Sequence, residues 1–166
     1  IGIGSQPIEG YNYGARNYRR VRQTFTRSVI VALIAGFIGW ACFQFLTMPI
    51  ISIFGNENEL YNEFAVKCFR IFLALLCVSG LTAVSGIFFQ AIGKPLKAML
   101  VSLSRQVLFF IPSLLILTGS MGLEGALYTG PCADALALLF TSVLVFLEMR
   151  QLNALIRAQE SGAAGN

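Results

Sequence analysis

The chain contains two long runs of residues without a charged side chain. The first covers residues 28–56 and the second covers residues 71–93. About 20 consecutive apolar residues allow a helix to cross the roughly 30 Å hydrocarbon core of a bilayer, so each run is long enough to span it. Only helices and closed barrels satisfy the backbone in lipid, and these runs do not alternate apolar and polar residues. We therefore expect an all-α integral membrane protein.

The composition agrees with a membrane protein. Of the 166 residues, 56% are hydrophobic and 12% are charged, whereas an ordinary soluble domain carries about 25% charged residues. Four complete spans are predicted, at residues 28–54, 71–93, 98–119 and 125–147. At about 1.5 Å per residue the second span reaches roughly 34 Å, and the longer first span must tilt or extend into an interface. Residues 153–166 are expected to form a tail with a disordered end.

Basic side chains gather on one side of the predicted spans. Ten of the 12 Lys and Arg residues precede the first span, surround the connection between the second and third spans, or follow the fourth. Arg105 is counted among those near that connection, and the opposite side holds only Lys67 and Arg70. The positive-inside rule places the larger group in the cytoplasm. The sequence thus predicts a multi-pass plasma-membrane protein with a cytoplasmic C-terminus.

Two connections predict specific local structures. Residues 17–27 interleave basic side chains with Tyr18, Val21 and Phe25, a pattern typical of an amphipathic helix lying at the inner interface. A solvated basic linker is the alternative. Residues 93–95, Gly-Lys-Pro, predict a sharp turn, because glycine commonly follows the end of a helix and proline fits the first turn of the next.

Several kinds of chemistry are excluded or disfavoured. The chain has no histidine, which removes His-based catalysis and His metal ligation, and no enzyme activity, metal or cofactor is expected. The four cysteines show no CxxC spacing, so small apolar fillers are favoured over a zinc site or a disulfide. A bridge between Cys68 and Cys132 stays open. In a membrane chain the net charge of +4 indicates topology rather than nucleic-acid binding, and lipid is the expected surrounding.

Asp134 is the only carboxylate inside a predicted span. An aspartate at a helix centre costs about 2.5–3.5 kcal/mol to insert, and nine apolar residues after it return roughly 4.5 kcal/mol, so the helix still inserts. Helical spacing places Gly130, Ala137 and Thr141 on the same face, which predicts an interior stripe. The alternative is an aspartate near the outer end that hydrogen-bonds a neighbouring helix beside Pro131.

The second span carries small and polar residues on one face, namely Ser79, Ala83, Gly86 and Gln90, with Thr82 and Ser85 adjacent. Small residues permit helices to approach closely, and hydroxyl groups can bond between helices. Helix packing explains this face, and the lining of a cavity is the alternative. Thr82 is accordingly a candidate cavity residue, as is Asp134.

The first and third spans contribute further candidates. In the first, Ala32/Gly36 and Ala35/Gly39 form small-xxx-small pairs, which are typical of close helix packing. Trp40 near the middle can fill the core or stack on a flat or cationic ligand, and Gln44, one turn on, is the third candidate cavity residue. Pro112 interrupts the third span and predicts a kink.

Ordered motifs suggest a family. Residues 6–15, QPIEGYNYGA, closely resemble the QPI-x-G-(Y/F)-NYGA segment of the multidrug and toxic compound extrusion (MATE) transporters, and residues 88–95, FFQAIGKP, are similar to their FQAIGKP turn. SRQ at 104–106, Ile111-Pro112, and the segment from Gly122 to Asp134 continue the similarity in order. We expect the motif residues to shape helix ends and turns rather than to touch a drug; they are Gln6, Pro7, Gly10, Asn12, Tyr13, Gly14, Gln90, Gly93, Lys94 and Pro95.

The resemblance implies a twelve-helix antiporter of two six-helix lobes. Residues 1–152 would then be part of the carboxy-terminal lobe: the end of the eighth helix, which began upstream of this chain, followed by helices nine to twelve. Such transporters export organic, often cationic, drugs in exchange for sodium or protons. The sodium-coupled branch resembles a scheme with an acidic residue in the tenth helix. Since residues 71–93 contain no Asp or Glu, the coupling ion is expected to bind in the other lobe.

Two other functions remain open. A lipid-linked saccharide flippase of the same superfamily would need basic residues in its cavity to hold a pyrophosphate. Arg105 is expected close to the inner boundary, so no basic residue is expected deep in the spans, which disfavours this reading. The other alternative is a helical membrane subunit that transports nothing by itself. A drug antiporter that works by alternating access is the leading hypothesis.

Overall fold

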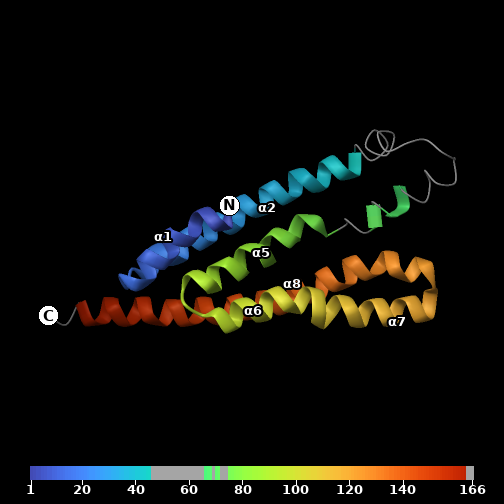
Figure 1. The fold of residues 1–166 in the computed structure, drawn as a ribbon. Coiled ribbons are helices and arrows are strands. Elements are labelled where there is room, and N and C mark those ends of the chain that lie inside the picture. The colour runs from blue at the N-terminus through green and yellow to red at the C-terminus, as the bar shows by residue number, and fades with distance from the viewer. Residues whose placement is uncertain (46–65, 69, 72–74, 164–166) are drawn as a thin grey trace.

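The computed structural model describes residues 1–45, 66–68, 70–71 and 75–163. Every element named within these ranges is a helix. In chain order the elements are α1 (Gly2–Gly14), α2 (Tyr18–Phe45), α5 (Leu76–Ala91), α6 (Pro95–Leu103), the π-helix η1 (Ser104–Phe110), α7 (Ile111–Met121) and α8 (Leu123–Ala163). Figure 1 shows an elongated bundle with the α5–α6 turn at one end and the α7–α8 turn at the other. The predicted all-α class is confirmed.

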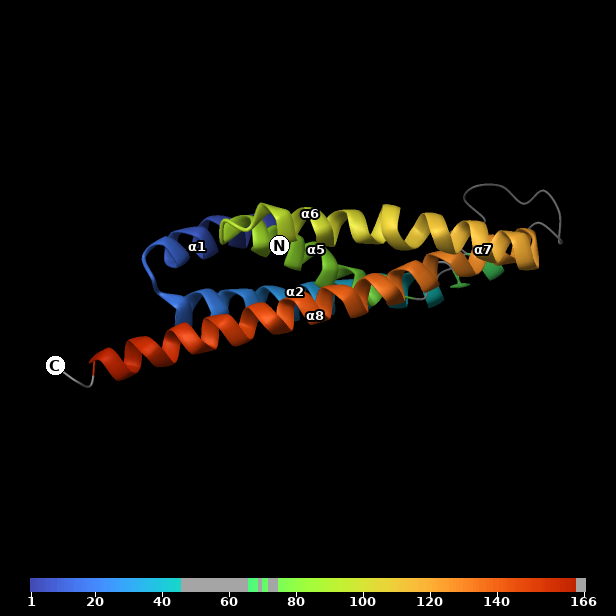
Figure 2. The ribbon, with the colours of Figure 1, turned by 90° about the horizontal axis from the view of Figure 1, so that it is seen from below.

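Three helices are long and apolar enough to cross a membrane, by length and composition: Tyr18–Phe45, Pro95–Ser120 and Gly125–Ser161. Cys77–Ala91 is a shorter apolar helix. Helix α2 packs against α5, α1 packs against both, and α8 packs against η1 and α7. Figures 1 and 2 both show α8 running along the bundle, with its C-terminal end extending beyond the α5–α6 turn.

The helices depart from the predicted boundaries in two places. The basic residues 18–27 are helical, but they form the first turns of α2 instead of a separate interfacial helix. No proline interrupts the chain between this segment and the span, so the helix propagates without a break. Helix α8 continues to Ala163, so most of the predicted tail is helical. Residues 46–54 of the first predicted span and 72–74 of the second lie outside the described residues.

The sharp turn predicted between the second and third spans is confirmed. Helix α5 ends at Ala91, Gly93 has a φ of +72°, and Pro95 occupies the first turn of α6. A left-handed φ is accessible to glycine without the steric penalty of a Cβ atom. The backbone N–H of Lys94 donates to the carbonyl of Phe89 at 2.8 Å, which closes the turn.

Pro112 changes the helix that contains it. The seven residues before Ile111 form the π-helix η1, and Pro112 lies in the first turn of α7. Proline offers no N–H to the carbonyl four residues earlier, and its ring crowds that carbonyl. In a π-turn a carbonyl bonds to the N–H five residues on, which lets the helix pass the missing donor. The sequence predicted an interruption here, and the structure gives its form.

The core lies where α2, α5, α6 and α8 meet, near the α5–α6 turn. It consists of Val21, Phe25, Ala32, Val84, Phe88, Phe89, Ile92, Ala98, Val101 and Leu152. Between α2 and α5, a Cβ on Gly36 would lie 2.7 Å from the carbonyl oxygen of Cys77, and one on Gly80 would lie 3.1 Å from that of Ala32. In lipid such close packing drives helix association, as predicted for Ala32 and Gly36.

Candidate functional site

A partly open cavity of about 280 Å³, lined by both polar and apolar residues, lies between α5 and the α6–η1 helix. Its lining residues are Ser79, Thr82, Ala83, Gly86, Ile87, Gln90, Val101, Ser102, Arg105 and Gln106. The α5 members recur every three or four residues, so they share one face of that helix. Most of them have short side chains, which leaves room between the helices. The face for which packing and cavity lining were both open thus lines a cavity.

Arg105 is the charged residue of this cavity wall. Its Nε donates to Oδ1 of Asp134 on α8, at 2.5 Å. The Arg105 side chain is 47% exposed, whereas the Asp134 side chain is 9% exposed. Asp134 does not belong to the cavity lining. Arg105 is therefore both a residue of the cavity wall and the partner of a buried carboxylate.

Arg105 follows Pro95, the start of α6, by ten residues, which is about 15 Å along a helix. It falls inside the Pro95–Ser120 helix that is long and apolar enough to span, as it does in the predicted span 98–119. Its placement close to the inner boundary stays a prediction.

Asp134 lies on the predicted interior stripe of α8. Gly130, Ala137 and Thr141 are all buried, and Ala133 is 1% exposed. Asp134 also bonds a neighbouring helix, as the alternative reading expected, but it lies eleven residues into α8 and so not at the outer end. Its partner is the arginine of η1, which explains how a buried carboxylate is tolerated within a span.

The three candidate cavity residues have different places. Thr82 lines the cavity, and Asp134 lies behind Arg105. Gln44 is near the end of α2, where its Nε2 donates to the backbone carbonyl of Arg70 at 3.4 Å, and it does not line this cavity. Trp40 packs beside Phe37, with ring centroids 5.5 Å apart.

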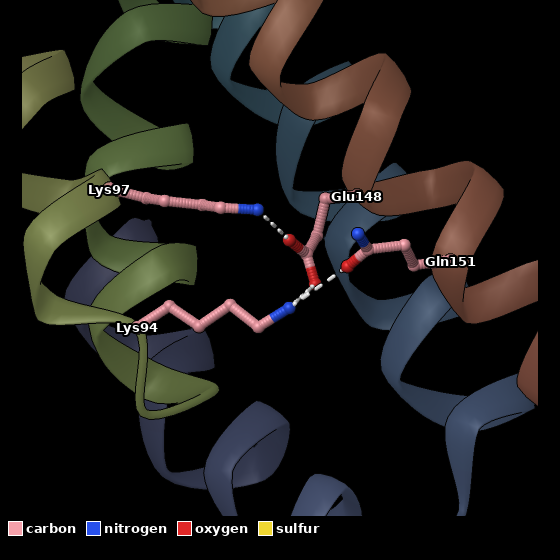
Figure 3. Close-up of polar contacts among 4 residues, drawn as sticks. All are labelled: Lys94, Lys97, Glu148 and Gln151. Atoms are coloured by element: carbon pink, nitrogen blue, oxygen red, sulfur yellow. Dashed lines mark hydrogen bonds and ion pairs between the residues drawn. The ribbon is translucent and has the colours of Figure 1, made fainter.

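A second polar cluster fastens the α5–α6 turn to α8 (Figure 3). We call Lys94, Lys97, Glu148 and Gln151 the lysine–glutamate cluster. Glu148 pairs with Lys94, and its Oε2 accepts from Lys97 Nζ at 2.8 Å. Lys94 Nζ also donates to Gln151 Oε1 at 3.2 Å. The α5–α6 turn, formed by Gly93, Lys94 and Pro95, is thus held in place by Lys94. Its partner Glu148 was not identified from the sequence.

The N-terminal motif shapes the end of α1 and the following turn. Asn12 donates its Nδ2 to the carbonyl of Ile8 at 2.7 Å, and its own carbonyl accepts from the N–H of Asn17 at 2.7 Å. Tyr13 meets Tyr18 edge to face, with centroids 5.6 Å apart. A Cβ on Gly10 would lie 3.2 Å from the carbonyl oxygen of Ala91, so this glycine lets α1 approach α5.

Other motif residues lie on α1 or line the cavity. Pro7 is inside α1, Gly14 is its last residue, and Gln6 is half-buried. Gln90 lines the cavity in addition to accepting the N–H of Gly93 at the turn. The sequence had placed Gln90 both in the turn motif and on the Ser79–Gly86 face, for which cavity lining was the alternative.

All four cysteines are free, so the bridge left open between Cys68 and Cys132 does not form. Cys42 and Cys132 are exposed, and Cys68 and Cys77 are half-buried. In the ranges that the structure describes, no three His, Cys, Asp or Glu side chains come together as metal ligands.

These features define a class: an all-α membrane bundle with a cavity between its helices. The family model MatE matches residues 1–116. The chain belongs to the MATE family of transporters, and family membership indicates a transporter rather than an enzyme. The search of curated proteins found no match.

Solved structures share the fold. A structure described as the MATE multidrug transporter DinF-BH in complex with rhodamine 6G is 35% identical, with a TM-score of 0.80, and the match covers 86% of this chain and 32% of that chain. Outward-facing and inward-facing structures of a multidrug resistance MATE family transporter of the MOP superfamily are 16% and 15% identical, each with a TM-score of 0.81. These two matches each cover 94% of this chain, and they cover 35% and 36% of the respective solved chains. The chain thus spans about a third of the structures it matches.

Proposed function

We propose that the protein containing this chain is a secondary active antiporter that exports small organic molecules, often cationic, in exchange for sodium or protons. The observation that carries the proposal is the family match together with a polar cavity inside the bundle. The similar DinF-BH structure was solved in complex with rhodamine 6G, which supports a small organic molecule as the substrate. A cavity of about 280 Å³ is slightly below the range of about 300–1,000 Å³ that is typical of ligand pockets. This lobe would therefore supply only part of the binding site.

Alternating access fits the way in which the lobe is built. Its fold is equally similar to an outward-facing and an inward-facing structure. A lobe that keeps its fold in both states moves as a rigid body, and rocking of one bundle against the other then exposes the substrate to either side. An ion favours one orientation only if it binds that orientation more tightly.

The coupling ion is proposed to bind in the other lobe of the transporter. Helix α5 contains no Asp or Glu. Asp134, the carboxylate within a predicted span, is already bonded to Arg105, which supplies its counter-charge. Glu9, a buried carboxylate of α1 without a hydrogen-bond partner in the described residues, is the remaining candidate in this lobe.

The experiment is dye export from living cells. The full-length protein, with a C-terminal epitope tag, is expressed in cells that lack their own drug pumps, and ethidium accumulation is measured. We expect lower ethidium accumulation than in cells without the protein. We expect the tag to be accessible only from the cytoplasmic side of the plasma membrane. Unchanged accumulation despite confirmed membrane expression would refute drug export, and a tag reached from outside would refute the orientation.

The flippase alternative gains no support. Arg105 lines the cavity, so one basic residue is present there. A single guanidinium that is already bonded to Asp134 cannot balance a pyrophosphate, which carries at least two negative charges. A subunit that transports nothing is not favoured either, because similar solved structures are described as multidrug transporters.

A further inference from the structure

The cavity wall carries one kind of charge. Among its ten lining residues, Arg105 is the charged one, and five others offer hydroxyl or amide groups: Ser79, Thr82, Ser102, Gln90 and Gln106. A cationic group in this cavity would therefore face a guanidinium. An anionic group would face a cation and several hydrogen-bond donors.

The guanidinium has donors to spare. Arginine has five N–H donors, and within the described part of the chain Arg105 forms one hydrogen bond, from Nε to Asp134. The other four N–H groups belong to the two terminal nitrogens. Arg105 lines the cavity and its side chain is 47% exposed, so the side chain keeps accessible surface for a ligand. Two parallel N–H donors fit the two oxygens of a carboxylate.

Asp134 fixes the guanidinium and also supplies its counter-charge, so a ligand would meet oriented hydrogen-bond donors. The Asp134 side chain is 9% exposed, lies on α8 and is not part of the cavity lining. A hydrogen bond through Nε leaves the edge formed by the two terminal nitrogens open to a ligand. This arrangement orients a donor before a ligand arrives, which lowers the entropic cost of binding.

We propose that this cavity is a subsite for a carboxylate, or a comparable anionic group, of the transported molecule, with Arg105 as the binding residue and Asp134 as the residue that positions it. The inference rests on the proposed function and narrows the substrate class. Molecules with a cationic ring system and a carboxylate place the carboxylate here and the cationic part in the portion of the site formed outside this chain. A purely cationic molecule leaves this subsite empty.

A matched pair of dyes tests the subsite. Rhodamine 6G is an ethyl ester, and its hydrolysis gives a free acid with the same ring system and an added carboxylate. Binding of each dye to the purified full-length protein is measured by fluorescence anisotropy, independently of transport. A hydrogen-bonded charge of this kind contributes roughly 10- to 100-fold in affinity. We expect Arg105→Gln to weaken binding of the acid by about 10-fold or more and to change binding of the ester by less than about twofold.

Two further variants separate binding from folding. Arg105→Gln/Asp134→Asn removes both charges and leaves no unpaired buried carboxylate, and it is expected to show the same loss that is specific to the acid. Arg157→Gln, an exposed arginine on α8, is the control and should bind both dyes as the unmodified protein does. An equal loss of both dyes in the double variant, or acid binding that does not depend on Arg105, overturns the proposal. A protein that binds the acid through Arg105 but exports no dye would retain the subsite and refute the proposed function.

Discussion

The lysine–glutamate cluster leads to a quantitative prediction for the end of the bundle that contains the α5–α6 turn. The Glu148 side chain is 2% exposed, while those of Lys94 and Lys97 are 29% and 30% exposed. Removing one partner of a fully buried ion pair costs about 3–5 kcal/mol. Water can partly rehydrate the two lysines, so we expect a smaller cost for Glu148→Gln, about 2 kcal/mol. That corresponds to a roughly 30-fold larger population of the locally open state.

Hydrogen–deuterium exchange measures this opening where it occurs. The turn between α5 and α6 is joined to α8 by the cluster, so amides around residues 89–98 exchange through its local opening. We expect these amides to exchange up to about 30-fold faster in Glu148→Gln, with little change at the distant α7–α8 turn. Glu160→Gln removes an exposed carboxylate from the same helix and is the matched control.

A double-mutant cycle identifies the source of the effect. Lys97→Met keeps most of the aliphatic length of the side chain and removes its charge. If the two groups act together, adding Lys97→Met to Glu148→Gln costs less than Lys97→Met alone. Exchange at the turn that differs by less than about twofold between Glu148→Gln and the control would show that the cluster does not stabilise this end of the lobe.

Two predictions concern packing and burial in the helices before the α5–α6 turn. Gly36→Ala should destabilise the full-length protein, because its Cβ would lie 2.7 Å from a backbone oxygen of α5. Gly39→Ala, whose Cβ would have nothing within 4 Å, should not destabilise it. Thermal unfolding in detergent compares the two variants, and equal unfolding midpoints would refute the close α2–α5 contact. Glu9 is fully buried in α1, and neither carboxylate oxygen has a hydrogen-bond partner in the described residues. Because burying an unpaired charge is costly, Glu9→Gln should raise the unfolding midpoint, and a lower midpoint would mean that another part of the protein binds this carboxylate.

Features that depend on local pattern were predictable from the sequence. Runs without charge predicted helices because lipid excludes unsatisfied backbone. Residues 93–95 predicted the turn because the φ of +72° at Gly93 and the fixed φ of proline are properties of those residues alone. The stripe through Asp134 followed from helical periodicity, which depends only on spacing.

Features that depend on contacts between distant residues were not predictable. Glu148 is separated from Lys94 by 54 residues and from Lys97 by 51, and no local pattern pairs them. Arg105 and Asp134 are separated by 29 residues, and no local pattern pairs them either. Their contact explains how a carboxylate is tolerated within a span.

The two ion-paired sites together explain why α6, η1 and α8 can move as one body. Asp134 and Glu148 are separated by 14 residues of α8, or about 21 Å, and each bonds to the helix that begins at Pro95 or to the turn before it. Two ion pairs at different positions along α8 fix both the register and the rotation of α8 against the helix that begins at Pro95. A slip of a single residue would separate both pairs. The contacts of Glu148 hold the α5–α6 turn against α8. In the other ion pair, Arg105 is also a residue of the cavity wall. The same pairing that makes the lobe rigid therefore also keeps a cation oriented toward the space where a substrate would bind.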